Sequence, residues 1–218
     1  SNNPVCYLGT LNLFSNEFIS YQWTGPNGFE SILQNPSLSN VTGTANGTYQ
    51  VEATAENGCK ATSSTEIDII VPTISSNSPV CEESLLNLFS SEGTSHSWTG
   101  PNEFTSSEQK PSIPANGLEA VSEYTLVITD ANSCVSTLST AVTINNLPTI
   151  TLEENTVACM GSTLNLNVSG GISYAWTGPE GFSSSEQNPV LTNLSFTQAG
   201  RYYVTVPNEN HCSKLDSI

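Results

Sequence analysis

The sequence predicts an all-β chain made of three tandem β-sandwich domains. Three observations predict it: a set of landmarks that recurs three times, apolar residues that alternate with polar ones, and turn residues at regular intervals. No stretch keeps a 3.6-residue apolar period through three helical turns. Only 11% of the residues are charged, so polarity comes mainly from Ser, Thr, Asn and Gln, which suit exposed sheet faces better than helices.

The repeat is defined by its three tryptophans, which are the only ones in the chain: Trp23, Trp98 and Trp176. In each copy a cysteine precedes the tryptophan at a constant spacing: Cys6, Cys81 and Cys159. A Gln-x-Pro motif, a tyrosine and a second cysteine follow each tryptophan, again at constant spacing. The spacing predicts domains at residues 1–72, 73–148 and 149–218, with strand A of the first and the end of strand G of the third incomplete.

Alternation predicts the strands of the first copy, and the other copies repeat them. Leu11–Phe14, Tyr21–Thr24, Tyr49–Ala55 and the chain from Cys59 onward read as strands, the last with Ile67, Ile69 and Val71 facing inward. Asn57-Gly58 is a hairpin signal between the last two strands. The order matches strands B, C, F and G of an immunoglobulin domain. We therefore expect three tandem immunoglobulin-like β-sandwich domains in an extended array.

Six aromatic residues are expected to form the structural core of the domains: Trp23, Trp98, Trp176, Tyr49, Tyr124 and Tyr202. Alternation points each tryptophan inward on strand C, and a tyrosine at the start of strand F suits a tyrosine corner. Gly25–Gly28 reads as a type I turn with Pro26 in its second position, after which Phe29 packs back on the domain. A sugar-stacking role for the tryptophans would need exposed rings.

The six cysteines suggest disulfides, because their number is even and their spacing strict. One pairing lies within each copy, at the same separation every time: Cys6–Cys59, Cys81–Cys134 and Cys159–Cys212. A second pairing is staggered between copies: Cys6–Cys134 and Cys81–Cys212, with Cys59 and Cys159 reaching towards flanking repeats. Six buried free thiols are the third possibility.

The strand assignment favours the staggered pairing. Cys6 precedes strand B and Cys59 follows the F–G turn, so the two lie at opposite ends of one sandwich. A strand of five to seven residues would hold them roughly 17–23 Å apart, whereas a disulfide needs Cα atoms within about 7 Å. In a tandem array the A–B turn of one copy faces the F–G turn of the next. Such bonds would stiffen the array.

Net charge and composition exclude several classes of partner. Twenty acidic residues against four basic ones give a formal charge of −16, so phosphate backbones and anionic membranes would repel the chain. No apolar run approaches the roughly 20 residues that a membrane helix needs. We therefore expect no nucleic-acid binding and no membrane insertion in this segment. The expected partners are neighbouring repeats, and surface polysaccharide or other cells are candidates.

Catalytic and metal-binding patterns are lacking in the sequence. The two histidines, His96 and His211, lie in different copies without a Cys/His/Asp cluster at ligand spacing. No nucleophile elbow, phosphate loop or paired-carboxylate context occurs. We expect no enzyme activity, no catalytic residue, no metal and no cofactor.

The pattern Pro-Val-Cys, Leu-x-Leu, Trp-Thr-Gly-Pro-Asn-Gly-Phe, Gln-Asn-Pro, Gly-Thr-Tyr and Asn-Gly-Cys resembles the Ig-like and PKD-like repeats of secreted Bacteroidota proteins. These include gliding-motility adhesins and other cargo of the type IX secretion system. The resemblance covers all three copies. It implies an extracellular, cell-surface molecule of many domains, whose signal and sorting segments lie outside this chain, and it brings no catalytic residue.

Two functions from different classes follow. The first is a non-enzymatic, disulfide-stiffened stalk or filament that presents adhesive sites for attachment or gliding. The alternative is a carbohydrate-binding accessory module of a secreted enzyme, which would need aromatic residues in variable loops. Phe18 and Phe196 are the weak candidates for such loops. Because these aromatic residues are few, the sequence favours the stalk.

Overall fold

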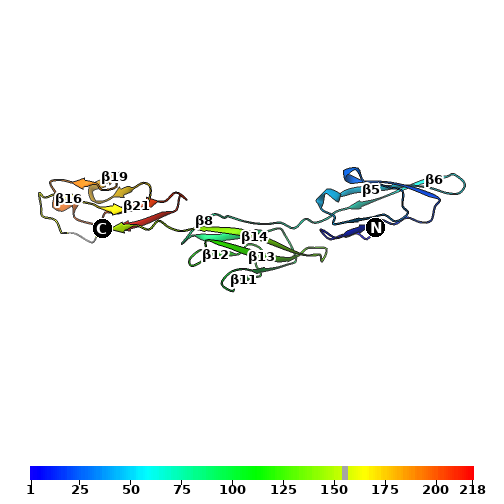
Figure 1. Cartoon of the computed structure of the whole chain (residues 1–218), viewed down its shortest axis with the longest axis horizontal. Helices are drawn as coiled ribbons and strands as arrows, with labels where there is room; N and C mark the ends of the chain where they lie inside the picture. Colours follow the sequence, from blue (N-terminus) through cyan, green and yellow to red (C-terminus); the bar gives the residue numbers. More distant parts are fainter. Residues whose placement is uncertain (154–156) are drawn as a thin grey trace. The chain divides into compact units, whose positions relative to one another are not determined.

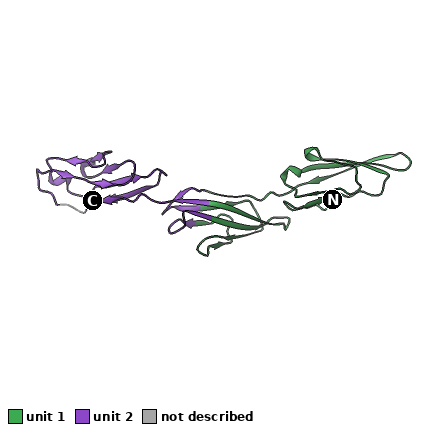
Figure 2. Cartoon of the chain, in the orientation of Figure 1, with its two compact units in different colours: residues 1–76, 87–112, 123–141 green, residues 77–86, 113–122, 142–218 purple. Residues whose placement is uncertain are grey.

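The computed structural model of the chain describes residues 1–153 and 157–218. Within them it has 22 β-strands and four short 3-10 turns, η1 to η4, and the described residues form no α-helix. Contacts divide the chain into two compact units (Figure 2): residues 1–76, 87–112 and 123–141, and residues 77–86, 113–122 and 142–218. The division falls inside the second repeat, so the domain boundaries near residues 72 and 148 remain a prediction.

The first repeat lies in the first unit and forms two antiparallel sheets (Figure 1). One sheet has the strand order β3-β2-β5-β6, and the other pairs β1 with β4. Their inward side chains share one apolar cluster, which includes Leu11, Trp23 and Tyr49. The elements are β1 (Thr10–Asn12), β2 (Ser20–Thr24), η1 (Pro26–Gly28), β3 (Glu30–Ser31), β4 (Ser37–Ser39), η2 (Gly43–Ala45), β5 (Gly47–Thr54) and β6 (Lys60–Ile67).

The second repeat supplies strands to both units. One sheet has the order β11-β10-β13-β14-β8, and the other β12-β9-β7. The pairing of β14 with β8 is parallel and sets Ile144 opposite Val80. The strands are β7 (Ile74–Ser76), β8 (Val80–Cys81), β9 (Leu85–Ser90), β10 (Ser95–Thr99), β11 (Thr105–Ser106), β12 (Ser112–Pro114), β13 (Val121–Thr129) and β14 (Val135–Asn145).

The third repeat lies in the second unit. Its main sheet has the order β19-β18-β21-β22, and two smaller sheets pair β16 with β20 and β15 with β17. The elements are β15 (Thr151–Leu152), β16 (Leu164–Asn165), β17 (Val168–Ser169), β18 (Ala175–Thr177), η3 (Pro179–Gly181), β19 (Ser183–Ser184), β20 (Val190–Leu191), η4 (Phe196–Gln198), β21 (Tyr203–Pro207) and β22 (Ser213–Ser217).

The longest hairpin of the first repeat shows why alternation locates the strands. Strands β5 and β6 pair in register from Gly47–Ile67 to Thr54–Lys60. On β5, Tyr49 and Val51 are buried while Gln50 between them is exposed, as a period of two requires. The prediction for the segment after β6 holds only in part. Ile69 is buried, but Val71 is 39% exposed, because β6 ends at Ile67 and the chain then leaves the sheet.

The strand order is that of an immunoglobulin-like sandwich. In the second repeat, β9, β10, β13 and β14 take the places of strands B, C, F and G, as the sequence predicts. Strands β7 and β12 complete the sheet of β9, and β11 extends the sheet of β10. The tryptophan of strand C and the tyrosine of strand F are fully buried, at 0% exposure for Trp98 and Tyr124. The chain is therefore an all-β array of immunoglobulin-like repeats.

The turn after strand C is not the predicted type I turn. The Phe29 amide donates to the Pro26 carbonyl at 3.1 Å, so Pro26 is the first residue of the turn rather than the second. The two central residues, Asn27 and Gly28, have φ values of 57° and 75°, as in a type I′ turn. In the third repeat Glu180 adopts φ 56° despite its side chain. The twist of the hairpin favours the primed turn and outweighs that residue's preference.

Candidate functional site

The cysteines occupy two kinds of turn, and each kind recurs in all three repeats. The first cysteine opens the turn before strand B, where its carbonyl accepts the amide three residues on: Gly9 to Cys6 at 2.8 Å, Ser84 to Cys81 at 3.2 Å and Ser162 to Cys159 at 3.1 Å. The second cysteine closes the F–G hairpin, where its carbonyl accepts the amide four residues back: Ala55 to Cys59 at 2.9 Å, Asp130 to Cys134 at 3.0 Å and Asn208 to Cys212 at 2.9 Å.

Two disulfides connect the first kind of turn to the second kind in the next repeat. Cys6 bonds to Cys134 in the first unit, with Cα atoms 5.3 Å apart. Cys81 bonds to Cys212 in the second unit, with Cα atoms 5.6 Å apart. These are the staggered pairs that the strand assignment favours. We call each such contact, a strand-B turn bonded to the F–G hairpin of the following repeat, a joint.

The hairpin cysteines of the joints are buried and held by an acidic or amide side chain. Cys134 is 4% exposed and Cys212 is 0% exposed. The Asp130 carboxylate accepts the Cys134 amide at 2.9 Å, and the Asn208 side-chain oxygen accepts the Cys212 amide at 3.0 Å. Each hairpin thus presents its sulfur from a fixed backbone.

Polar groups lie close to the disulfide in the second unit, and a hollow lined by both repeats lies in the first unit. In the second unit the Asn208 side-chain amide donates to the Asn146 carbonyl at 2.8 Å, and the Cys212 sulfur lies 3.8 Å from the Asn145 carbonyl. In the first unit a shallow hollow of about 340 Å³ is lined by residues of both repeats, Asn3, Pro4, Asp68, Ile70 and Asn132. The joint in the second unit therefore combines a covalent bond with polar contacts beside it.

Cys59 and Cys159 are free and exposed. The backbone of each follows its bonded counterparts: Cys159 opens the same turn as Cys6 and Cys81, and Cys59 closes the same hairpin as Cys134. The Cys59 amide donates to the Asn57 side chain at 3.1 Å. Their pairing with flanking repeats remains a prediction.

The tryptophans are buried and bonded, so their rings are not a surface for sugars. Trp23, Trp98 and Trp176 are at most 3% exposed. Each indole N–H donates to a carbonyl in the chain after the short strand that pairs with strand C, which is β3, β11 or β19: Leu33 at 3.0 Å, Glu108 at 2.8 Å and Gln187 at 3.3 Å. Each tryptophan thereby ties that segment to the core.

Two of the three strand-F tyrosines form the predicted corner. The Tyr49 hydroxyl donates to the Ala45 carbonyl at 3.1 Å, and the Tyr202 hydroxyl to the Gln198 carbonyl at 2.8 Å. Among the described residues the buried Tyr124 hydroxyl finds no hydrogen-bond partner. Burial raises the pKa of all three above the ordinary value of 10.0, and the nearby Glu180 carboxylate further raises the pKa of Tyr202.

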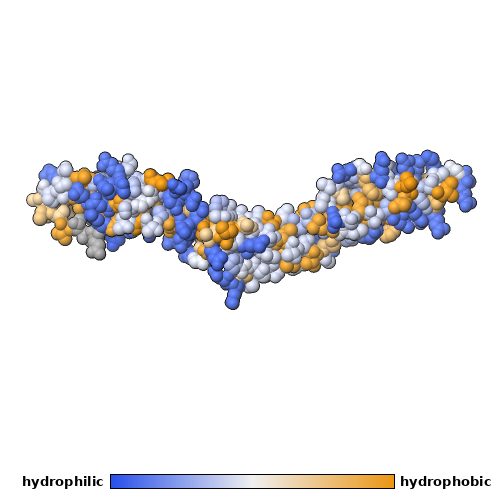
Figure 3. All heavy atoms as spheres, in the orientation of Figure 1, coloured by the Kyte–Doolittle hydropathy of each residue, from blue (hydrophilic) through white to orange (hydrophobic). Residues whose placement is uncertain are grey.

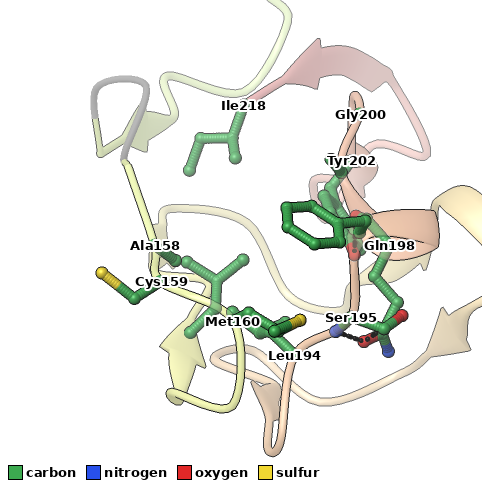
Figure 4. A pocket seen from close by; sticks show the side chains of 12 residues that line it. Ala158, Cys159, Met160, Leu194, Ser195, Gln198, Gly200, Tyr202 and Ile218 are labelled. Carbon is green, nitrogen blue, oxygen red and sulfur yellow. Dashed lines mark hydrogen bonds between the residues drawn. The ribbon is translucent and has the colours of Figure 1, made fainter.

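The two loop phenylalanines, Phe18 and Phe196, lie in different units. Phe18 is half-buried and lines a hollow of about 440 Å³ with Phe14 and Trp23. Phe196 is 80% exposed beside a hollow of about 230 Å³ (Figure 4). On the face drawn in Figure 3, hydrophobic and hydrophilic residues are interspersed.

A packing requirement at the glycine of Trp-Thr-Gly-Pro escaped the sequence analysis. A Cβ atom on Gly25, Gly100 or Gly178 would lie 2.4–2.6 Å from the ring of the strand-F tyrosine. That ring also meets the motif's phenylalanine edge to face, with centroids 5.3–5.7 Å apart. The three-fold recurrence of the motif was the only signal, and it did not reveal this contact.

The glutamine of the Gln-x-Pro motif was also missed. Its side-chain amide donates to a carbonyl at the end of strand B or in the chain just after it: Gln34 to Ser15 at 3.1 Å, Gln109 to Ser90 at 3.2 Å and Gln187 to Val168 at 2.9 Å. The constant position of this glutamine in the repeat was visible in the sequence, but its hydrogen bond was not.

Residues 1–153 and 157–218 contain no group of three or more His, Cys, Asp or Glu side chains placed to hold a metal ion. None of the helical turns in this part of the chain has the length or the apolar run needed to cross a membrane.

No protein-family model and no curated protein matches the sequence. Among solved structures, the chain is similar to the three N-terminal domains of the bacteriophage RB49 highly immunogenic outer capsid protein (Hoc). The TM-score is 0.47 at 12% identity, over 97% of this chain and 93% of that one.

Two further solved structures are similar to the chain at lower TM-scores. A 1.5-MDa bacterial ice-binding adhesin has a TM-score of 0.36 at 14% identity, over 96% and 89% of the two chains. Sidekick-1 immunoglobulin domains 1–5 have a TM-score of 0.32 at 15% identity, over 99% and 56%. The immunoglobulin-like assignment rests on the strand order described above.

Proposed function

We propose that this chain is a non-enzymatic segment of a large extracellular repeat protein, in which staggered disulfides turn consecutive immunoglobulin-like repeats into a stiff stalk. The observation that supports it most directly is the pair of bonds Cys6–Cys134 and Cys81–Cys212. Two repeats that are joined only by the connecting chain can rotate relative to each other. A disulfide that joins the same two repeats at a second point restricts most of this rotation.

An extracellular location agrees with the same bonds, because disulfides form and persist in oxidising compartments. The two bonds span 128 and 131 residues of sequence. In the chain-entropy model, closing loops of this length stabilises the folded state by about 5 kcal/mol each. Small sandwiches with modest cores benefit most from such cross-links.

The role that we propose for the stalk is to present adhesive sites for cell-surface attachment or gliding, as the resemblance to Bacteroidota repeats implies. Weak sites on successive repeats would bind with avidity. The net charge of −16 would keep neighbouring stalks apart in solution. Cys59 and Cys159 would continue the staggered pattern into flanking repeats of the same kind.

Small-angle X-ray scattering with matched cysteine variants tests the stiffening. The Cys6→Ser/Cys134→Ser double variant should broaden the distribution of end-to-end distances, because it frees one joint. The Cys59→Ser/Cys159→Ser double variant removes two free thiols and should scatter like the parent chain. If the first variant scatters like the parent, the disulfide does not stiffen the joint, and the stalk proposal fails.

Carbohydrate binding is the second candidate, favoured by the 80% exposure of Phe196 beside a hollow. A glycan array on the whole chain tests it. Saturable binding that is lost in Phe196→Ala or Phe18→Ala would replace the stalk by a carbohydrate-binding module. The stalk proposal expects no such binding.

A further inference from the structure

The last strand of the second repeat, β14, has a free edge that carries no charge. Its residues, Val135–Asn145, include no charged side chain, no proline and no glycine. Its sheet has the order β11-β10-β13-β14-β8 (Figure 1), and the parallel pairing with β8 covers only Ile144 and Asn145. Within the described part of the chain, residues 135–141 therefore pair with β13 on one side and with no strand on the other.

Comparable edge strands elsewhere in the chain are protected against further pairing. Proteins block an open sheet edge with a very short strand or with charged side chains. At the opposite edge of the same sheet, β11 has only two residues. The last strands of the other two repeats carry charges, Lys60 and Glu66 on β6 and Lys214 and Asp216 on β22. The free edge of β14 has neither kind of protection.

The backbone groups along this free edge are regularly spaced. The F–G hairpin closes with the Asp130 amide bonded to the Cys134 carbonyl at 3.0 Å. Because the direction of the backbone groups alternates in an antiparallel ladder, every second residue after Cys134 bonds to β13. Thr143 shows the other direction, since its amide and its carbonyl both bond to the Ser78 hydroxyl on the β8 side. The N–H and C=O groups of four residues therefore face the free edge: Val135, Thr137, Ser139 and Ala141.

The same seven residues are suited to pair with a second copy of themselves. In an antiparallel pairing centred on Leu138, each residue meets one of its own class: Val135 with Ala141, Ser136 with Thr140, Thr137 with Ser139, and Leu138 with Leu138 of the second copy. The four edge-directed residues then lie opposite one another and exchange hydrogen bonds. Cross-strand pairs of Thr with Ser stabilise a sheet, and no like charges face each other. The half-buried Leu138 would gain an apolar neighbour.

We propose that the free edge of β14, residues 135–141, joins two copies of this chain through an antiparallel strand pair with two-fold symmetry. Such a pair uses the same surface on both copies, which the seven-residue pattern provides. This surface does not depend on the stalk function, since it follows from one strand of one repeat.

The charge of the chain makes this pairing depend on salt. Two chains with a charge of −16 repel each other over the Debye length, which falls from about 30 Å in 0.01 M salt to about 8 Å in 0.15 M salt. Charges that face each other directly across a strand pair lie closer than either length. We therefore expect the pairing to strengthen between these two salt concentrations, while substitutions within the strand still act on it.

Sedimentation velocity of the whole chain tests the pairing. Every chain carries Cys59→Ser/Cys159→Ser, so that free thiols cannot link two copies. At the higher salt concentration we expect a reversible monomer–dimer equilibrium. Thr137→Glu/Ser139→Glu should raise the dissociation constant of the dimer at least about tenfold, because like charges then face each other. Thr62→Glu/Ser64→Glu places the same charges at the equivalent exposed positions of β6 and should leave the constant nearly unchanged.

Mixing two variants tests the register and shows that both still fold. Thr137→Lys/Ser139→Lys should dimerise as weakly as Thr137→Glu/Ser139→Glu, whereas an equimolar mixture of the two should form dimers, because each glutamate then faces a lysine.

Four results would overturn the proposal. The parent chain stays monomeric or forms irregular aggregates, the Thr137→Glu/Ser139→Glu variant dimerises like the parent, Thr62→Glu/Ser64→Glu weakens the dimer to the same degree, or the mixture dimerises no better than its components. All variants keep both disulfides, so none of these results would affect the stalk proposal.

Discussion

The strand-F tyrosine has a different environment in the second repeat from that in the other two. Tyr49 and Tyr202 each donate a corner hydrogen bond, while within the described residues the buried Tyr124 hydroxyl has no partner. A net hydrogen bond is worth roughly 1 kcal/mol, and a buried unsatisfied hydroxyl costs a comparable amount. The hydroxyl group thus stabilises the fold at Tyr49 and Tyr202 and destabilises it at Tyr124.

Replacing these tyrosines by phenylalanine tests that difference. Tyr49→Phe should lower the free energy of unfolding by about 1 kcal/mol, because the bond to Ala45 is lost. Tyr124→Phe should be neutral or stabilising, because no bond is lost. Urea denaturation measures the free energy of unfolding of the two variants. An equal loss of this free energy in both variants would mean that the Tyr124 hydroxyl has a hydrogen-bond partner.

The two glycines that bracket Pro26-Asn27 should respond differently to alanine. A Cβ on Gly25 would meet the Tyr49 ring at 2.6 Å, so Gly25→Ala should cost about 1–3 kcal/mol through overpacking. A Cβ on Gly28 meets nothing within 4 Å, and its counterpart Glu103 carries a side chain at φ 60°, so Gly28→Ala should cost only the backbone strain of about 1 kcal/mol. Thermal unfolding compares the two variants, and we expect the lower melting temperature for Gly25→Ala. A lower melting temperature for Gly28→Ala would contradict the packing argument.

Alkaline pH should destabilise the chain through the same tyrosines. Their pKa values are raised by burial in the folded state, so the unfolded state loses protons first as the pH rises above 10.0. The contribution of these tyrosines to the free energy of unfolding is therefore complete below pH 10.0. It is lost as the pH rises through the pKa values that the tyrosines have in the folded state. Urea denaturation between pH 9 and 11 should show a falling free energy of unfolding.

A control separates this titration from thiol chemistry. The measurement uses a Cys59→Ser/Cys159→Ser background, since free thiolates exchange with disulfides at alkaline pH. Adding Tyr49→Phe to that background should make the fall less steep. A fall of unchanged steepness would assign it to other groups.

At the scale of the element, the F–G hairpin is the part that positions the sulfur. Asp130→Ala should destabilise the chain by about 2 kcal/mol, because buried amides of the hairpin lose a charged acceptor. Asp130→Asn should cost much less, since Asn208 fills the same place in the third repeat. Urea denaturation compares them, and equal losses would show that the charge rather than the acceptor matters.

Strands were predictable where alternation alone decides them. Leu11 with Leu13, and Tyr49 with Val51, locate strands B and F from local sequence, and both pairs are buried, although strand B of the first repeat, β1, ends at Asn12 rather than at Phe14. The type of the turn after strand C was not predictable, because Pro26 suits the second position of a type I turn as well as the first position of a type I′ turn. The hairpin twist decides, and it depends on the pairing of β2 with β3.

The disulfide joints could be predicted from the sequence in part. Strand polarity and repeat order place Cys6 near the hairpin of the next copy, so the staggered pairing followed from topology. The contact between Gly25 and Tyr49 could not be predicted from the topology, because the two residues lie on different segments of the repeat and only the folded core brings them together. Long-range packing at a glycine leaves no local pattern.

At the scale of the whole molecule, the repeat acts through its joints. Each compact unit contains one complete disulfide, and each disulfide follows the same rule of first cysteine to second cysteine in the next copy. Cys59 and Cys159 are the two members of the series for which this chain has no partner of the required kind. Under this rule, Cys59 and Cys159 would pair only with cysteines of further repeats of the same kind.

Disulfide mapping of the native chain shows whether consecutive repeats are cross-linked. Free thiols are alkylated at acidic pH to prevent exchange, the unreduced chain is digested, and linked peptides are identified by mass spectrometry. We expect bonds Cys6–Cys134 and Cys81–Cys212, with Cys59 and Cys159 alkylated. Bonds within one repeat, Cys6–Cys59 or Cys81–Cys134, would contradict it, because the joints would then carry no cross-link.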